Sequence, residues 1–299
     1  MNESVWRDKG YRESQNGLAV ADNNKTGGRR NMNKTIDKPA NGTGEWAAHN
    51  VNIHVRGCEH RCAYCYAQAM AIRFGRATPE SWEVPVIDAT KVAKRYGRKK
   101  GRIMFPTAHD CTPANLDACL VVLKKILASG NEVLVVSKPH LECVRLLCTE
   151  LAPFKAQILF RFTIGSADDA VLKAWEPGAP SFSERLECLK HAFYAGFETS
   201  VSCEPMLDGR IDKVIAKAKP YVTDAIWLDR ANRLRQIVSV NRPDDAKAKA
   251  LANSLISVMT DDYVRELYAR YCNDPAIKFK DSIKKVVGLE RPTVKGLDV

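Results

Sequence analysis

The sequence lacks the features of a membrane or secreted protein. No apolar stretch reaches the ~18 residues that a transmembrane helix needs. The first residues, MNESVWRDKGYRES, contain no apolar segment of the kind found in a secretory signal peptide. No internal repeat recurs at the period of a solenoid. Hydrophobic residues make up 45% of the 299 residues and charged residues 27%, which is an ordinary globular balance. We therefore expect a cytoplasmic globular protein that makes no membrane contact.

The cysteines lack the pattern of a disulfide framework. The chain has ten of them, and a cytoplasmic protein keeps its thiols reduced. Cys58, Cys62 and Cys65 fall within eight residues, whereas the other seven cysteines are scattered. This asymmetry indicates one metal site plus ordinary buried thiols.

Acidic residues are in deficit, with 35 Asp and Glu against 46 Lys and Arg, and the net charge of +11 favours anionic partners. From Lys91 to Arg102 (KVAKRYGRKKGR) there are seven basic residues and no acid, and a second basic excess lies near the C-terminus. Two interpretations stay open for these segments. They are either solvated faces of the protein, or the run at 91–102 is a nucleic-acid contact.

Three regions differ in their pattern. Residues 1–46 are polar and rich in Gly, Asn and Lys, and they predict an extended N-terminal arm, which Glu45 and Trp46 could tuck against the body. Residues 47–230 alternate between short apolar runs and helical patterns. Residues 231–299 predict a helical C-terminal extension, with helices at 247–259, 262–271 and 277–287.

The alternating region predicts the fold. Apolar or β-branched runs indicate strands at 51–55, 102–105, 132–136, 157–162, 198–202 and 225–228. Helical patterns separate them, such as 116–128 before Gly130 and 183–195 before Gly196, where glycine favours a helix C-terminus. Six strands that are each followed by a helix predict an α/β fold, wound as a partial (β/α)6 TIM-like barrel.

The three clustered cysteines form a C-x3-C-x2-C pattern directly after the first predicted strand. In a barrel, chemistry takes place at the carboxyl ends of the strands. Three thiolates can hold three irons of a [4Fe–4S] cluster and leave the fourth iron open, as a catalytic centre requires. The alternative is a zinc knuckle with His60 or a distant cysteine as fourth ligand. Because His60 lies only two residues from both Cys58 and Cys62 and no second cysteine pair exists, the pattern favours the cluster.

The loop GCEHRCAYCYA resembles the cluster loop of radical S-adenosyl-L-methionine (SAM) enzymes, particularly the spore photoproduct lyase-like branch. VVSKPH, which contains Lys138, and FRFTIGSADDAVLKAWEPGAPSFSERLE at 160–187 are similar to further signatures of that branch. The resemblance covers about residues 50–230. It implies an enzyme that cleaves SAM reductively to a 5′-deoxyadenosyl radical, which abstracts hydrogen from a substrate. The implied cofactors are a [4Fe–4S] cluster and SAM, and the implied partner is a reductant such as flavodoxin or ferredoxin.

The resemblance and the strand ends together suggest cofactor-binding residues. Lys138 could pair with the SAM carboxylate as a point charge, and Glu204 could bind the ribose hydroxyls. Tyr64 and Thr163 correspond to residues of the branch that contact SAM. Asp110 also suits a helix N-cap. The complete candidate set is Tyr64, Thr107, His109, Asp110, Lys138, Thr163 and Glu204, with Cys58, Cys62 and Cys65 as metal ligands.

Spore photoproduct lyases carry a hydrogen-donating cysteine on the segment where this sequence has Thr107. Tyr66, Cys111 or Cys203 could supply the hydrogen instead, although buried inert cysteines are common. We therefore expect a reaction other than photoproduct repair, with a nucleic-acid or nucleotide-derived substrate favoured over a peptide or small molecule. Two other functions stay open: a non-catalytic metal-binding protein that binds nucleic acid, and a radical SAM fold that acts as a partner subunit.

Overall fold

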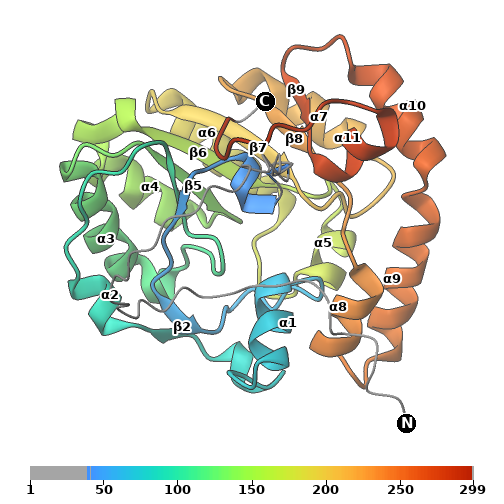
Figure 1. Ribbon diagram of the computed structural model, residues 1–299, viewed down its shortest axis with the longest axis horizontal. Helices are drawn as coiled ribbons and strands as arrows, with labels where there is room; N and C mark the ends of the chain where they lie inside the picture. The colour runs from blue at the N-terminus through green and yellow to red at the C-terminus, as the bar shows by residue number, and fades with distance from the viewer. Residues whose placement is uncertain (1–38, 41, 298–299) are drawn as a thin grey trace, which may run out of the picture. The chain divides into compact units, whose positions relative to one another are not determined.

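A curved sheet of seven parallel strands forms the centre of the computed structural model, which describes residues 39–40 and 42–297 (Figure 1). Most of the predicted arm, residues 1–46, lies outside the described residues. The strands follow the order β1-β4-β5-β6-β7-β8-β9 and pair in parallel throughout. Their bounds are β1 (His49–Asn50), β4 (Ile103–Phe105), β5 (Val133–Ser137), β6 (Ile158–Thr163), β7 (Glu198–Cys203), β8 (Ile226–Leu228) and β9 (Ile277–Phe279). The predicted α/β class and partial TIM-like barrel are confirmed.

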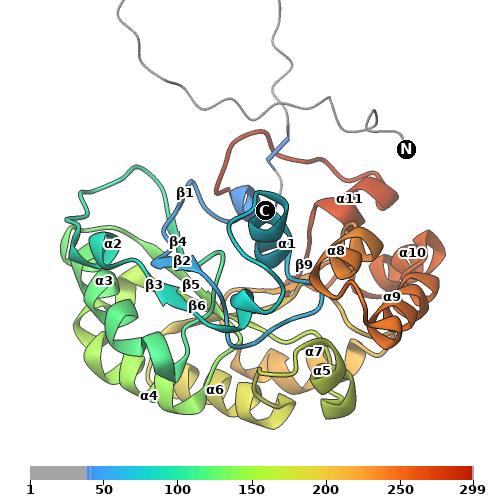
Figure 2. The same cartoon turned by 90° about the horizontal axis from the view of Figure 1, so that it is seen from below.

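Helices connect successive strands, because parallel neighbours require a crossover between them. Figure 2 shows α3, α4, α6 and α7 along the outer side of the curved sheet. The connecting helices are α3 (Leu116–Ala128), α4 (Leu141–Glu150), α5 (Asp169–Trp175), α6 (Phe182–Tyr194) and α7 (Asp212–Ala218). Short 3-10 helices lie at Gly42–Glu45, Ser81–Glu83, Pro113–Asn115, Ala152–Gln157 and Lys219–Tyr221. None of the helices in the described part of the chain is long and apolar enough to cross a membrane.

The first predicted strand, at 51–55, does not form as one strand, since β1 precedes it and β2 begins only at its end. β1 joins the main sheet beside β4, whereas β2 (His54–Arg56) pairs antiparallel with β3 (Val86–Ile87). The main sheet does not continue to β2 because the backbone of Ile53 makes no ladder bonds. Its N–H donates to the His109 ring, and its carbonyl accepts from the Asp88 N–H. The connection from β2 to β3 contains α1 (Tyr66–Arg73), and α2 (Ala89–Ala93) follows β3.

The C-terminal segment is helical as predicted, except at one place. It forms α8 (Leu234–Asn241), α9 (Ala246–Val258), α10 (Asp261–Tyr271) and α11 (Asp281–Val287). The helix predicted over 277–287 instead begins with β9, the seventh strand of the sheet. The physical reason is a period of two: Ile277 and Phe279 are buried in the outer core, and Lys278 and Lys280 alternate with them and lie over the Trp227 and Trp46 rings of the interior.

The interior of the curved sheet has a small apolar core of its own. It contains Met104, Leu134, Leu159 and Trp227 of the strands, together with Trp46. The Trp46 and Trp227 rings meet edge to face with centroids 5.8 Å apart, and the guanidinium of Arg161 lies over both rings. Glu45 and Trp46 are both buried. These two residues therefore pack against the body, whereas the arm before residue 39 lies outside the described residues.

Candidate active site

The three clustered cysteines lie on the loop between β2 and α1. Gly57 begins this loop with φ +88°, and a side chain there would meet the Val84 carbonyl oxygen at 2.6 Å, so only glycine fits. Cys65 caps α1, with its Sγ accepting from the Gln68 N–H at 3.4 Å. Burial raises the pKa of Cys58 to about 12 and also raises the pKa values of Cys62 and Cys65. These three thiols are free, and binding of a metal would couple to the loss of their protons.

The donor set suits an iron–sulfur cluster better than a zinc ion. A ligand atom from each of Cys58, His60 and Asp110 lies within 4.8 Å of the others, which is the spacing of a single-ion site. Both ring nitrogens of His60 are engaged, however. Nδ1 is 2.8 Å from Asp110 Oδ2, and Nε2 is 2.8 Å from Nε2 of His140. His60 is therefore not free to complete a zinc knuckle, and three soft thiolates remain for a cluster.

The segment after β6 holds the cysteine loop in place. The Ala63 N–H donates to the Trp175 carbonyl at 2.9 Å, and the Gly178 N–H donates to the His60 carbonyl at 3.2 Å. A Cβ on Gly178 would lie only 2.0 Å from the Glu59 carbonyl oxygen, so the two backbones approach as closely as glycine allows. Glu176 accepts a hydrogen bond from the Tyr64 hydroxyl. The segment 176–178 thus packs directly against the cysteine loop.

Glu176 and Arg185 form an ion pair in which both side chains are fully buried. Burial alone would raise the pKa of Glu176, but the charges of Arg185 and Lys138 lower it below its usual value. Arg185 also donates to the Pro180 carbonyl at 2.9 Å and to the Thr163 carbonyl at 3.1 Å. The ion pair connects the cysteine loop to the end of β6.

Lys138, Asp110 and Tyr64 lie together beside the cysteine loop. Asp110 Oδ1 accepts from the Lys138 backbone N–H at 2.7 Å, and Oδ2 lies 3.6 Å from Lys138 Nζ. Lys138 Nζ also lies 5.8 Å from the centre of the Tyr64 ring. Burial would lower the pKa of Lys138, but Asp110 and its other acidic neighbours raise it, so the side chain stays an ammonium. Asp110 does not cap a helix, since Thr112 caps the turn that follows.

Thr107 and His109 bond mainly to neighbouring backbone and to Asn52. Asn52 Oδ1 accepts from the Thr107 N–H at 2.7 Å, and its amide donates to the Thr107 hydroxyl at 2.6 Å. His109 accepts from the Ile53 N–H and donates to the Asp110 carbonyl. Burial lowers the pKa of His109 to about 3, so it is neutral. Tyr66 at the start of α1 donates to the Thr107 carbonyl at 2.5 Å, which places its hydroxyl beside this segment.

Charged side chains also follow the last three strands. Glu204 follows β7, Asp229 follows β8 and Lys280 follows β9. Lys280 Nζ donates to Glu204 Oε2 at 2.7 Å and lies 3.8 Å from the centre of the Trp46 ring. Burial, and then the Glu204 charge, raise the pKa of Asp229 to about 7. Lys138 and Thr163 lie at the same carboxyl edge of the sheet, at the ends of β5 and β6, so the strand order brings these candidates to one end of the barrel.

The structure places the thiols of Cys111 and Cys203 away from the candidate residues at the carboxyl edge. Both thiols belong to the core between the sheet and the outer helices. On β7, Val201 and Cys203 alternate with Ser202, and Glu204 follows on the opposite side. A hydrogen bond with Cys119 and burial raise the pKa of Cys111 far above its usual value. Of the three predicted hydrogen donors, Tyr66 is the one next to the cysteine loop.

Two residues of the C-terminal segment support the site without having been expected. The Asn241 amide donates to the Ala63 and Cys65 carbonyls at 3.0 and 2.9 Å. Arg242 donates to the Arg61 carbonyl at 2.5 Å. Both come from the end of α8, more than 170 residues beyond the loop. The sequence carries no signal for a contact across that separation.

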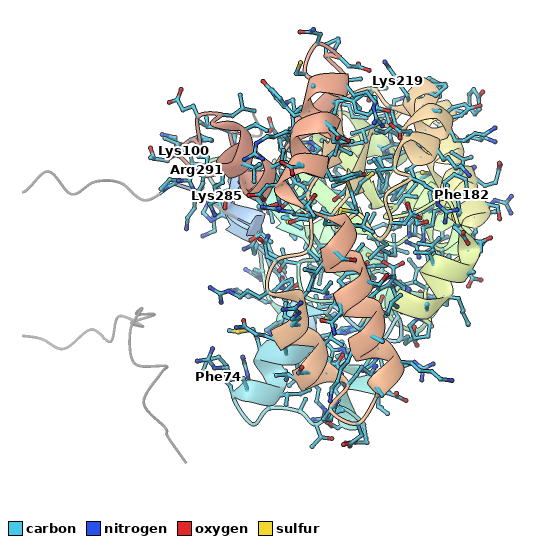
Figure 3. All side chains as sticks on the ribbon, turned by 90° about the vertical axis from the view of Figure 1, so that its right-hand side faces the viewer. Phe74, Lys100, Phe182, Lys219, Lys285 and Arg291 are labelled. Atoms are coloured by element: carbon cyan, nitrogen blue, oxygen red, sulfur yellow. The ribbon has the colours of Figure 1, made fainter. Side chains whose placement is uncertain are left out.

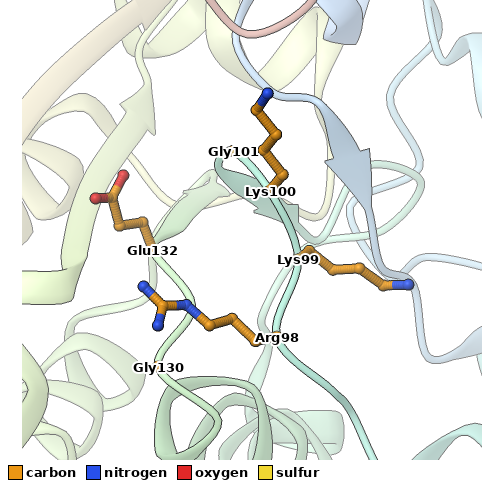
Figure 4. A pocket seen from close by; sticks show the side chains of 6 residues that line it. All are labelled: Arg98, Lys99, Lys100, Gly101, Gly130 and Glu132. Atoms are coloured by element: carbon orange, nitrogen blue, oxygen red, sulfur yellow. The ribbon is translucent and has the colours of Figure 1, made fainter.

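The basic run at 91–102 starts beside the candidate site, where Lys91 Nζ donates to the His54 carbonyl at 3.4 Å, and its later residues lie at the other end of the barrel. It precedes β4, and its Arg98, Lys99 and Lys100 line an open hollow of about 590 Å³ with Gly130 and Glu132, which precede β5. Figure 4 shows the side chains of Lys99 and Lys100 diverging from that of Arg98. The amino ends of these strands are opposite the edge that carries Lys138. Residues 98–100 of the run are therefore separate from the candidate site.

Comparisons with known proteins agree with this geometry. A family model described as the Radical SAM superfamily matches residues 52–218. An uncharacterized protein, ORF301, of Acidianus two-tailed virus is 25% identical over 162 residues, which cover 50% of this chain and 53% of the viral protein. The chain thus spans about half the length of the curated relative that it matches.

Solved structures of spore photoproduct lyase have a similar fold. One complexed with dinucleoside spore photoproduct has a TM-score of 0.52 at 14% identity, covering 83% of this chain and 80% of that one. A variant of the lyase with bound AdoMet and dinucleoside spore photoproduct also has a TM-score of 0.52, at 16% identity, covering 79% and 76%.

Proposed function

Since the chain belongs to the radical SAM superfamily, we propose that Cys58, Cys62 and Cys65 hold its [4Fe–4S] cluster and that its substrate is nucleic-acid or nucleotide-derived. Enzymes of this superfamily use such a cluster together with SAM. When bound, the two cofactors supply an electron and a sulfonium whose cleavage yields methionine and a 5′-deoxyadenosyl radical. The single observation that carries the proposal is the set of three free thiols on the loop between β2 and α1, two of them buried and the third, Cys65, partly buried.

The polar residues of the carboxyl edge have roles in this proposal that follow from their chemistry. Lys138 is a buried ammonium beside the loop and binds the SAM carboxylate. Glu204 offers a carboxylate to the ribose hydroxyls, and Thr163 lies at the end of the strand between them. Tyr64 is part of the cysteine loop, and its ring faces Lys138 Nζ. Asp110 and Thr107 complete the set at the end of β4, and His109 holds that segment to residue 53.

Tyr66 is the hydrogen-relay residue in this proposal. Its hydroxyl lies beside Thr107, and the residue directly follows the cluster ligand Cys65. The thiols of Cys111 and Cys203 lie in the outer core instead. Because Thr107 occupies the position of the lyase thiol, the proposed outcome differs from photoproduct repair.

Two observations support a nucleic-acid or nucleotide-derived substrate. The chain carries a net charge of +11, and its fold is similar to that of a lyase solved with a dinucleoside ligand. Within the basic run at 91–102, Arg98, Lys99 and Lys100 lie at the opposite end of the barrel and would contact a polyanion outside the site. Flavodoxin or ferredoxin is the proposed electron donor.

The proposal is tested by anaerobic reconstitution with iron and sulfide, followed by addition of SAM and dithionite. We expect release of 5′-deoxyadenosine that depends on dithionite. Cys62→Ala should abolish the release, whereas Cys272→Ala, at the exposed cysteine after α10, should leave it unchanged. Lys138→Met should raise the KM for SAM.

Each contrary result identifies a different function. A colourless protein that holds one zinc would indicate a structural metal knuckle in a nucleic-acid-binding protein. A bound cluster without SAM cleavage, even with nucleic acid present, would indicate a partner subunit. Either result overturns the proposed enzyme.

A further inference from the structure

One face of α1 is apolar and exposed. Tyr66, Met70 and Phe74 are four residues apart, so they lie on one side of the helix, and their exposed fractions are 50%, 43% and 60%. We call these three residues the α1 stripe. The neighbouring face of α1 is buried, with Ala67 and Ala71 packed in one cluster with Trp82 and Cys58. The stripe is therefore not needed to hold α1 in the fold.

The α1 stripe begins at the candidate active site. Tyr66 follows Cys65, and its hydroxyl bonds to Thr107 at the carboxyl end of β4. Eight residues later, about 12 Å along the helix, Phe74 lies just beyond the other end of α1. Figure 3 shows the Phe74 side chain projecting outward there, far from Lys100 of the basic run. A molecule lying along the stripe would reach from the outer surface to the site.

The outer end of the stripe has the chemistry of a base-stacking platform. The guanidinium groups of Arg73 and Arg76 lie 5.9 and 5.5 Å from the centre of the Phe74 ring. From Tyr66 to Pro79 the chain has no acidic residue. Aromatic rings exposed among arginines are typical of proteins that bind single-stranded nucleic acid, because bases stack on the rings and phosphates pair with the cations.

We propose that the α1 stripe, with Arg73 and Arg76, binds a single-stranded or locally unpaired nucleic acid and leads it to the site at Tyr66. The delivery of the nucleic acid to a reaction at Tyr66 rests on the proposed function, whereas its binding to the α1 stripe does not. A folded acidic protein, such as a reductant, would also meet the positive charge. The basic residues Arg98, Lys99 and Lys100 at the other end of the barrel favour the nucleic acid, since a long polyanion can reach two faces that a compact partner at α1 would not.

The test measures binding of a fluorescein-labelled 12-nucleotide single-stranded DNA to the reconstituted protein by fluorescence anisotropy. Phe74→Ala should raise the Kd roughly tenfold or more, which is the usual effect of losing one stacked base. Arg73→Gln with Arg76→Gln should lower the slope of log Kd against log salt concentration by about 1.4. Tyr194→Ala, at an exposed tyrosine of α6, is the matched control and should leave binding unchanged.

Dithionite-driven SAM cleavage by the same variants separates the two proposals. We expect Phe74→Ala to cleave SAM at the wild-type rate. If the wild type cleaves SAM but the Kd is the same for Phe74→Ala, the stripe is not a nucleic-acid surface, although the proposed function stands. If Phe74→Ala loses turnover only when a flavodoxin supplies the electron, the stripe is a reductant contact and the inference is wrong. DNA binding that depends on Phe74 in a protein that never cleaves SAM would instead overturn the proposed function alone.

Discussion

The buried pair of Glu176 and Arg185 offers the sharpest test of how the cysteine loop is held. Replacing Arg185 with alanine leaves the Glu176 carboxylate buried with Tyr64 as its remaining close partner, and it also leaves the Pro180 and Thr163 carbonyls without their donor. Removing one partner of a buried ion pair typically costs about 3–5 kcal/mol. We expect Arg185→Ala to lower the free energy of unfolding by about that amount.

Urea denaturation followed by tryptophan fluorescence measures this effect. The control is Arg210→Ala, which breaks an exposed pair with Asp168 and should cost at most about 1 kcal/mol. The double variant Glu176→Gln, Arg185→Met should recover part of the loss, because it buries no unpaired charge. Equal effects of Arg185→Ala and Arg210→Ala would refute the reasoning.

Acid should weaken the same pair. Although burial alone would raise it, Arg185 and Lys138 hold the pKa of Glu176 below its ordinary value of 4.5. A carboxyl group with a lowered pKa in the folded state contributes stability above its unfolded pKa and loses it as the pH falls through the folded value. The stability difference between wild type and Arg185→Ala should therefore shrink as the pH falls below about 4.5. A constant difference down to pH values that unfold the protein would contradict this account.

Three further predictions concern the supporting structure. Trp46→Ala should lower the free energy of unfolding by about 3–5 kcal/mol in urea denaturation, because the ring fills the interior of the sheet; a loss under about 1 kcal/mol would show that the arm does not belong to the core. Asn241→Ala should speed the loss of iron to a chelator, whereas Asn253→Ala at the exposed Arg235 contact should not. Burial raises the pKa of Glu45 from 4.5 to about 7, so this group makes the fold less stable as the pH rises between these values, and Glu45→Gln should flatten that dependence. An unchanged pH profile for the glutamine variant would contradict the assignment.

The sequence predicted the parts of the fold that depend on local pattern. Five of the six predicted strands lie at their expected places, because runs such as residues 132–136 combine apolar content with flanking turns. β9 was missed because its three residues are too short to outweigh the helical pattern of α11 that follows. The break between β1 and β2 was also missed. It depends on a hydrogen bond from residue 53 to His109, which only the folded chain brings near.

The candidate site shows the same limit. The sequence predicts Cys58, Cys62 and Cys65 as ligands because their spacing is local, and Lys138 as a SAM contact because it ends an apolar strand. The side of the sheet that Cys203 faces depends on the alternation along β7, which puts Val201 and Cys203 together in the outer core. Asn241 could not be found, because its contact with the loop joins positions 176 residues apart. The sequence shows the basic run at 91–102, but the position of Arg98, Lys99 and Lys100 at the amino ends of β4 and β5 depends on the topology.

The central claim, that three cysteines of this chain hold a catalytic iron–sulfur cluster, is tested most directly by metal and sulfide analysis after anaerobic reconstitution. The account predicts about four irons and as many sulfides per chain, with visible cluster absorbance. Cys58→Ala, Cys62→Ala and Cys65→Ala should each lose them, and Cys143→Ala in α4 should not. One zinc per chain, or a full cluster in the Cys62→Ala variant, would contradict it.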